Sequence, residues 1–412
     1  MSTANDTTPH PANALSSGHA ITSRFLLSEA TGSLGDLGTF VPITIGMVQI
    51  VGFDAGTVLL CTGLACIIAG VVFRIPMPVQ PMKAIGALAI AGAMTATQTS
   101  VAGLTVGLFI LVMAVTGLVG RLDKLIPRPV IRGLQMVVGL LLLRSGAQLA
   151  LYAPGSAALR PMWAVDGLAI VAVALILTVL LRRRLGWMAL GLVVAGFLAA
   201  YIKEPGLFQS ATVTLWRPAL AHMDSSSLSG AWLGGLPQIP MTFLNSVLAI
   251  SLLAGQLFPA GAGRTTPTRI AVSVGLMNLP IFALGGMPLC HGSGGLAAQH
   301  RFGARSSLAV IIRGAALLII GLLFGRFAMA WMFAFPASLL GVFLLIAGVG
   351  LARASQCWHT KPGLLAAIVM VAVHLVTGIL VLGFVAGWIT CVIVAKLAPR
   401  FEQFSDAEAP RA

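Results

Sequence analysis

The sequence predicts an all-α membrane protein that crosses the bilayer many times, and two observations carry that prediction. Of its 412 residues, 58% are hydrophobic and only 9% are charged, whereas a soluble domain usually carries about 25% charged residues. Apolar runs close to the length of a bilayer span, roughly 20 residues, recur from Leu34 to Lys396. A membrane β-barrel would show short alternating segments instead.

The apolar runs define about fourteen expected helical segments. In chain order they cover residues 34–50, 55–73, 84–94, 101–119, 130–149, 165–181, 187–202, 237–258, 270–284, 294–302, 308–324, 329–351 and 364–394. The last run is long enough for two short helices. The runs at 84–94 and 294–302 are too short to span a bilayer alone.

The two short runs follow interrupted sequence at matching places in the two halves of the chain. Met77-Pro78-Val79-Gln80 precedes the first and Met287-Pro288-Leu289-Cys290 precedes the second, with a weaker echo between Val41-Pro42-Ile43-Thr44 and Ile239-Pro240-Met241-Thr242. Paired interrupted segments are typical of a transporter built from inverted repeats, with its site at the breaks. We therefore expect two inverted repeats of seven segments each.

These repeats define the expected organisation of the chain. A polar tail over residues 1–24 has the composition of a disordered segment. The first inverted repeat covers residues 25–205 and the second covers 230–398. A short cytoplasmic tail over 399–412 completes the chain.

The net charge of +14 is explained by loops on the cytoplasmic side, which collect Lys and Arg. Even-numbered loops hold most of these residues, among them Arg301, Arg305 and Arg313, so both termini are expected in the cytoplasm. The protein is then a multi-pass protein of the cell membrane, the inner membrane if it is bacterial. No basic patch interleaved with aromatic residues is present, which argues against nucleic-acid binding.

Chemical motifs of enzymes are missing from the sequence. The five cysteines show no zinc spacing, so we expect neither a metal cluster nor a cofactor. No Walker A motif is present, and no nucleophile motif accompanies the adjacent Cys290 and His291. The chain is therefore expected not to be an enzyme.

The first break suggests an anion site. Pro81 suits the first turn of a helix, so we expect that helix to begin near Pro81 with its free N–H groups, including that of Ala84, inside the membrane. Such a helix start attracts anions. Lys83 opposes the helix dipole unless an anion binds there, and Gln80 adds an amide donor. The alternatives are that Lys83 extends to the membrane interface and that the prolines only kink ordinary spans.

The second break offers the same chemistry. Gly292, Gly294 and Gly295 permit close approach of the backbone to a ligand, and Ser293 is a candidate N-cap. Two facing helix starts would form a compact site for an oxyanion with one central atom. His291 is an equal candidate for substrate binding and for a structural loop residue.

Further polar residues could line the cavity. Gln238 precedes Thr242 and Asn245, and the last two share one helix face with Ser246. That face could equally hold helices together. Asp36 and Glu29 are candidates for carrying a coupling proton, or they could cap a helix start.

Taken together, GDLGTFVP, PMPVQPMKAI, GGLPQIPMTFLNSV and GGMPLCHGSGGLAAQHRFGAR resemble the molybdate transporter family related to sulfate permeases. The resemblance runs from about Phe25 to Lys396 in the family order. It implies uptake of molybdate, with sulfate as a related oxyanion, and the fold of sulfate and uracil permeases with core and gate domains. Half-helices at the two breaks would bind the substrate.

The resemblance leaves several substrates and mechanisms to weigh. Sulfate permeases usually end in a soluble STAS domain, which this sequence does not show, so molybdate is favoured over sulfate. A nucleobase permease of the same fold would place a carboxylate among residues 237–305, where there is none. An anion channel remains an alternative function, and a homodimer remains an alternative to a monomer. Moving a dianion into an inside-negative cell costs roughly 4.6 kcal/mol at 100 mV, which favours a secondary transporter with alternating access.

Overall fold

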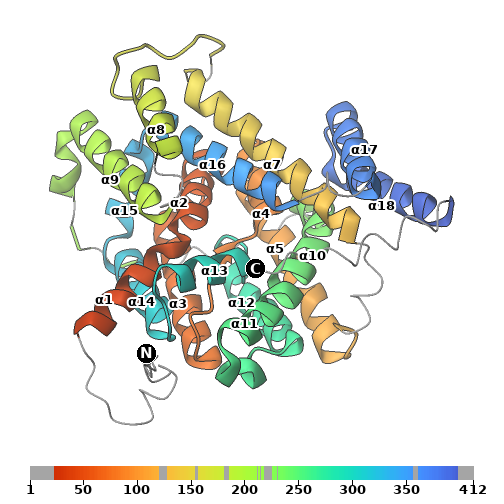
Figure 1. Cartoon of the computed structure of the whole chain (residues 1–412). Helices are drawn as coiled ribbons and strands as arrows, with labels where there is room; N and C mark the ends of the chain where they lie inside the picture. Colours follow the sequence, from red (N-terminus) through yellow and green to blue (C-terminus); the bar gives the residue numbers. More distant parts are fainter. Residues whose placement is uncertain are drawn as a thin grey trace, which may run out of the picture.

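The structure, a computed structural model, describes residues 23–119, 128–153, 156–180, 185–210, 212–213, 215–217, 225–229, 231–355 and 361–397. The tail expected over 399–412, and all but the last two residues of the tail expected over 1–24, lie outside these residues. Almost every described segment is helical (Figure 1).

The first half of the chain is a run of helices interrupted once by a strand. Its elements are α1 (Ser23–Ser33), η2 (Leu34–Asp36), α2 (Leu37–Gly46), η3 (Met47–Val51), α3 (Ala55–Phe73), β1 (Gln80–Pro81), α4 (Lys83–Ile90), α5 (Ala96–Val115), α7 (Arg128–Leu151), α8 (Leu168–Leu180), α9 (Leu185–Lys203) and η5 (Pro205–Ser210).

The second half repeats this plan. Its elements are η6 (Ser225–Leu228), η7 (Ala231–Gly235), α10 (Leu236–Met241), η8 (Thr242–Ala249), α11 (Ile250–Leu257), η9 (Pro259–Arg264), α12 (Pro267–Ala283), β2 (Leu289–Cys290), α13 (Ser293–Arg301), α14 (Leu308–Leu323), α15 (Gly325–Ala334), α16 (Ala337–Ser355), α17 (Lys361–Thr377) and α18 (Leu380–Leu397). The run at 364–394 is therefore two helices, as expected.

Several of the helices are long and apolar enough to cross a membrane. Among the described residues these are Ser23–Val51, Ala55–Phe73, Ala96–Val115, Arg132–Leu151 and Ser225–Leu257. Other apolar helices are shorter, among them α8, α14 and α17. The expected number of about fourteen spanning segments stays a prediction.

Three prominent helix pairs each join a helix of the first half of the chain to a helix of the second half. α3 packs against α14, α5 against α12, and α7 against α16. Small residues allow these close approaches: a Cβ at Gly63 would overlap the backbone of Gly314 and Leu318, an arrangement typical of helix pairs in lipid. Such pairing between the two halves fits the expected inverted repeats, whose bounds of 25–205 and 230–398 stay a prediction.

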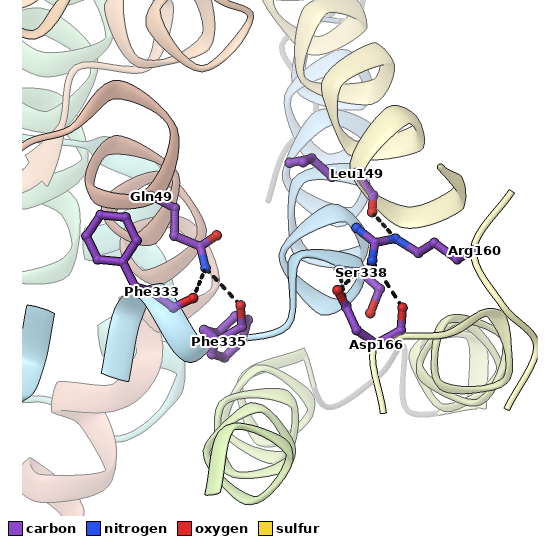
Figure 2. A network of polar contacts seen from close by, with 7 residues as sticks. All are labelled: Gln49, Leu149, Arg160, Asp166, Phe333, Phe335 and Ser338. Atoms are coloured by element: carbon purple, nitrogen blue, oxygen red, sulfur yellow. Dashed lines mark hydrogen bonds and ion pairs between the residues drawn. The ribbon is translucent and has the colours of Figure 1, made fainter. Parts of the chain in front are cut away.

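The expected single segment at 329–351 is wrong, because the chain bends by 87° between α15 and α16. Pro336 lies at the bend, where it cannot continue the helix. Gln49 donates from Nε2 to the carbonyls of Met332 (2.7 Å) and Phe335 (2.8 Å). Figure 2 shows Gln49 reaching this bend from η3. The free carbonyls at the end of α15 are thus satisfied by a side chain from another span.

A second side chain satisfies the other end of the bend. Asp166 accepts from the backbone N–H of Ser338 in the first turn of α16 (2.8 Å). Arg160, which is 5% exposed, donates to Asp166 and to the carbonyl of Leu149 (2.9 Å) at the end of α7. The loop between α7 and α8 therefore fixes the start of α16 to the end of α7 (Figure 2).

Candidate functional site

The two breaks meet in space, as the sequence predicts. β1 and β2 pair antiparallel with Gln80 opposite Cys290 and Pro81 opposite Leu289, and Met82 donates its N–H to the carbonyl of Pro288 (3.0 Å). Each strand leads directly into a short helix, α4 or α13. The N-terminal ends of both short helices therefore lie beside one two-stranded sheet inside the helical bundle.

The start of α4 differs from the expectation in two respects. Pro81 belongs to β1 and not to the first helical turn, so α4 begins two residues later, at Lys83. Its N–H groups are not all free, because Gln238 Oε1 accepts from Ala84 (2.8 Å) and Ile85 (3.3 Å). Gln238 Nε2 in turn donates to Thr242 Oγ1 (2.9 Å). The second half of the chain thus caps the short helix of the first half.

At the start of α13, the N-cap is Gly292 and not Ser293. Ser293 is the first helical residue, and its hydroxyl donates to Asn245 Oδ1 (2.6 Å). The N–H groups of Ser293 and Gly294 have no acceptor among the described residues. This helix start is therefore open to an anion, with Asn245 at its edge.

Two glycines make the close approach between β1 and α13 possible. A Cβ at Gly292 or Gly295 would overlap the side-chain amide of Gln80, whereas Gly294 has open space around it. Gly292 and Gly295 therefore serve packing, and Gly294 is the residue left facing free space.

Lys83 is half-buried in the first turn of α4. Its ammonium group forms no hydrogen bond with any described residue, although Asp36 and Cys290 lie within electrostatic range. A cation without a partner at a helix N-terminus is unfavourable. A bound anion would remove that conflict.

Arg313 is a residue that the sequence interpretation assigned to a loop, and this assignment is wrong. It lies inside α14 and is 6% exposed. Its guanidinium donates to Asp36 Oδ2 (2.8 Å) and to the carbonyl of Val79 (2.9 Å). The other carboxylate oxygen of Asp36 accepts from Gln80 Nε2. The signal that could have placed it is that residue 313 falls inside the apolar run 308–324.

The two carboxylates considered for proton coupling both have structural contacts. Glu29, which is 0% exposed, accepts from the N–H groups of Arg305 (2.8 Å), Ser306 (3.1 Å) and Ala309 (3.1 Å). It therefore caps the start of α14 from α1. Asp36 is 2% exposed and pairs with Arg313, so it anchors β1 to α14.

His291 is fully enclosed just after β2. Its Nδ1 contacts the carbonyl of Pro78 (2.9 Å) and its Nε2 contacts Ser273 Oγ (3.0 Å). Phe73 packs against the ring edge to face, with centroids 5.5 Å apart. Both ring nitrogens are occupied, so in this conformation the ring links the sheet to α12 and has no free position for a ligand.

The groups at the two breaks suit an anion better than a metal ion. Within the described residues, no three His, Cys, Asp or Glu side chains come together as metal ligands. The ammonium of Lys83, the open N–H groups of α13 and the start of α4 instead supply donors and positive partial charge.

Comparison with known sequences gives one consistent family. The family described as "Molybdate transporter of MFS superfamily" matches residues 28–142 and 230–351. Molybdate transporter 2 of Arabidopsis thaliana is 34% identical over 404 residues, which cover 88% of this chain and 86% of the relative. Molybdate transporter 1 of Chlamydomonas reinhardtii is also 34% identical, with 81% of this chain and 84% of the relative covered.

Comparison with solved structures confirms the fold class. The transmembrane domain of the cyanobacterial bicarbonate transporter BicA has a TM-score of 0.58 and 17% identity, and covers 90% of this chain and 98% of that one. The murine anion transporter Slc26a9 in its inward-facing state has a TM-score of 0.63 and 13% identity, covering 93% and 71%. The multi-pass helical fold of these two transporters is therefore present here.

Proposed function

This chain belongs to the molybdate transporter family, and on that premise we propose that it is a secondary active transporter that binds molybdate between the starts of α4 and α13. The observation that carries the proposal is the unpaired ammonium of Lys83 beside two short helix starts held together by the β1–β2 pair. Molybdate is a tetrahedral oxyanion, and its oxygens are acceptors for these donors.

The roles of the residues follow from their contacts. Lys83 supplies the positive charge, and the N–H groups of Ser293 and Gly294 donate to substrate oxygens. Asn245 positions Ser293 through the hydrogen bond between their side chains. Gly292 and Gly295 keep the amide of Gln80 against the start of α13.

At the start of α4, the side-chain oxygen of Gln238 accepts the hydrogen bonds that a substrate oxygen would otherwise accept. Its Oε1 occupies the position where an acceptor meets the N–H groups of Ala84 and Ile85. A substrate oxygen that replaces Gln238 Oε1 satisfies the same donors, and the released amide can turn toward the substrate. Thr242 holds Gln238 in its resting orientation.

An oxyanion is favoured over a nucleobase by the charge of the site. Residues 237–305 contain no Asp or Glu, so this segment offers no carboxylate to accept from a nucleobase. Asp36 is engaged by Arg313 and Gln80. Lys83 and the open N–H groups of Ser293 and Gly294 are donors, which suits an anion.

Transport proceeds by alternating access, with both termini on the cytoplasmic side. Carrying a dianion into an inside-negative cell costs roughly 4.6 kcal/mol at 100 mV, more than a thousandfold in concentration ratio. Net uptake therefore requires a coupled cation, protons or sodium, or trapping of the substrate inside.

The test is uptake of labelled molybdate into proteoliposomes that contain the full chain, with sulfate as competitor. Lys83→Ala should lower uptake at least tenfold, while Lys203→Ala, an exposed lysine at the end of α9, should leave it unchanged. Normal uptake by Lys83→Ala would overturn the proposed site. Transport of sulfate in preference to molybdate would instead assign the oxyanion permease as the function.

A further inference from the structure

The side chain of Gln80 has one polar atom that the fold leaves without a partner. Gln80 is 0% exposed, and its Oε1 accepts no hydrogen bond from the described residues. A buried amide oxygen without a donor is destabilising, and such atoms are rare in folded proteins. A donor supplied by a bound ligand would explain this one.

The orientation of the Gln80 amide is fixed by two charged residues. Its Nε2 donates to Asp36, whose other oxygen accepts from Arg313 (2.8 Å). Arg313 keeps its proton, and the ion pair makes the Asp36 carboxylate the acceptor of both hydrogen bonds, one from Arg313 and one from Gln80. Nε2 must therefore face Asp36, and Oε1 must point away from it.

Oε1 points toward the start of α13. A Cβ at Gly292 would overlap Oε1, and a Cβ at Gly295 would overlap Nε2. Gly292 is the N-cap of α13, and the open N–H groups of Ser293 and Gly294 follow it directly. The unpaired acceptor thus lies at the edge of the proposed oxyanion site.

This acceptor conflicts with a fully ionised substrate. A tetrahedral dianion carries only acceptor oxygens, which suit Lys83 and the N–H groups of α13 but repel an amide oxygen. A singly protonated oxyanion carries one O–H donor besides its acceptor oxygens. Of these two species, only the protonated one can satisfy Oε1 and the donors together.

From this geometry we infer that the bound species is the protonated monoanion, hydrogen molybdate, which donates its O–H to Gln80 Oε1. This inference rests on the proposed molybdate function. After release on the cytoplasmic side the monoanion loses its proton to water, giving molybdate dianion and one proton with no change in oxidation state. The substrate then carries its own coupling proton and only half the charge of the dianion.

The same contact separates molybdate from sulfate. Sulfate is a weaker base than molybdate, so at any pH near neutrality a much smaller fraction of it carries a proton. Sulfate bound at the site would leave Oε1 without a donor and would place an acceptor oxygen against it. A site that hydrogen-bonds a substrate O–H discriminates strongly against analogues that lack it.

Titratable and charged groups of the protein lie around Gln80 and its ion-pair partners. They are Asp36 on η2, Cys66 on α3, Lys83 on α4, Cys290 on β2, His291 after β2 and Arg313 on α14. Their effect must be separated from that of the substrate, which a variant of Gln80 achieves.

The experiment measures initial uptake of labelled molybdate by the reconstituted full chain as external pH is lowered through neutrality. The KM for total molybdate should fall about tenfold per pH unit, because only the protonated fraction binds. A pH dye trapped in the vesicles should record one proton released per molybdate. Gln80→Met, which lacks the acceptor, should flatten the pH dependence of KM and allow sulfate to compete.

Gln238→Met is the matched control, since it removes another amide beside the site. It should lower uptake but keep the pH dependence of KM. A pH-independent KM in the natural protein, or a slope that survives in Gln80→Met, would overturn the inference while the molybdate function stands. Absence of molybdate uptake at every pH would instead overturn the proposed function.

A second measurement covers the case in which Gln80→Met does not fold. Molybdate should raise the unfolding temperature of the purified natural protein more at lower pH, at equal total concentration, and sulfate should not. An equal rise at all pH values would contradict binding of the monoanion.

Discussion

The protein contains two kinds of helix break, and they differ in which groups hydrogen-bond the free backbone N–H and C=O groups at the helix ends. At the bend between α15 and α16, the Gln49 amide donates to the carbonyls of Met332 and Phe335. Asp166 accepts from the backbone N–H of Ser338 at the start of α16. At the breaks before α4 and α13, neither helix has a side-chain cap of its own. The start of α4 is capped by Gln238 of α10. The N–H groups of Ser293 and Gly294 at the start of α13 have no acceptor among the described residues.

This difference distinguishes the structural bend from the proposed ligand site. Every helix end exposes backbone groups that need partners, and fixed side chains supply them at the α15–α16 bend (Figure 2). Where no side chain of the short helix does so, an anion can. The comparison predicts that damage at the bend lowers stability, whereas damage at the α4 and α13 breaks lowers transport.

The largest effect is expected at Arg313, which holds the segment before β1 in place through Asp36 and the carbonyl of Val79. Arg313→Met leaves Asp36 as an unpaired buried charge and removes the hydrogen bond to Val79. Breaking a buried ion pair from one side costs about 3–5 kcal/mol. The free energy of unfolding in detergent should fall by that amount.

The control is the double variant Asp36→Asn with Arg313→Met, which removes both charges. It should recover most of the lost stability, because an uncharged pair can replace a buried ion pair. No recovery in the double variant would mean that packing of Arg313, and not its charge, holds β1.

Gln49→Leu tests the bend between α15 and α16. The change removes the donor for the carbonyls of Met332 and Phe335, and unpaired buried groups cost about 1–3 kcal/mol. Unfolding free energy should fall accordingly, while the KM for molybdate changes less than twofold. A large rise in KM with normal stability would place the bend in the binding process and break the comparison.

Gln238→Leu tests the break before α4, where uptake should change more than stability. The N–H groups of Ala84 and Ile85 lose an acceptor that water or substrate can replace, so the unfolding free energy should fall by less than about 1 kcal/mol. Uptake should fall about tenfold, equal to about 1.4 kcal/mol, because the released amide no longer contacts the substrate. Unchanged uptake would make Gln238 a purely structural cap.

Much of the fold could be predicted from the sequence because the membrane imposes it. Span length and apolar composition placed α3 at its observed bounds and separated α17 from α18. The two interrupted Met-Pro segments indicated that distant parts of the chain meet, and β1 pairs with β2 as that required. Lys83 was singled out because a cation is unusual inside apolar sequence, and Gly292, Gly294 and Gly295 because they cluster next to an interrupted segment.

The rest depends on contacts that have no local signal. Pro336 lies within a continuous apolar run, so the bend was missed. Arg313 was read as a loop charge because its partner Asp36 lies 277 residues away. The capping of α4 by Gln238 likewise joins residues 154 apart. Such polar pairs form only after the halves pack together, and they decide which donors of the site remain free.

The smallest effect is expected at Glu29, where the sequence left a choice between proton coupling and helix capping. Glu29→Gln keeps one acceptor oxygen for Arg305 and Ser306 but loses the one for Ala309 and the negative charge at the start of α14. Loss of a charged cap costs about 1 kcal/mol. Stability should fall by that amount, and the pH dependence and rate of uptake should stay within twofold. Since Gln cannot release a proton, loss of pH-dependent uptake with a normal unfolding free energy would instead show that Glu29 carries the coupling proton, and the cap would be secondary.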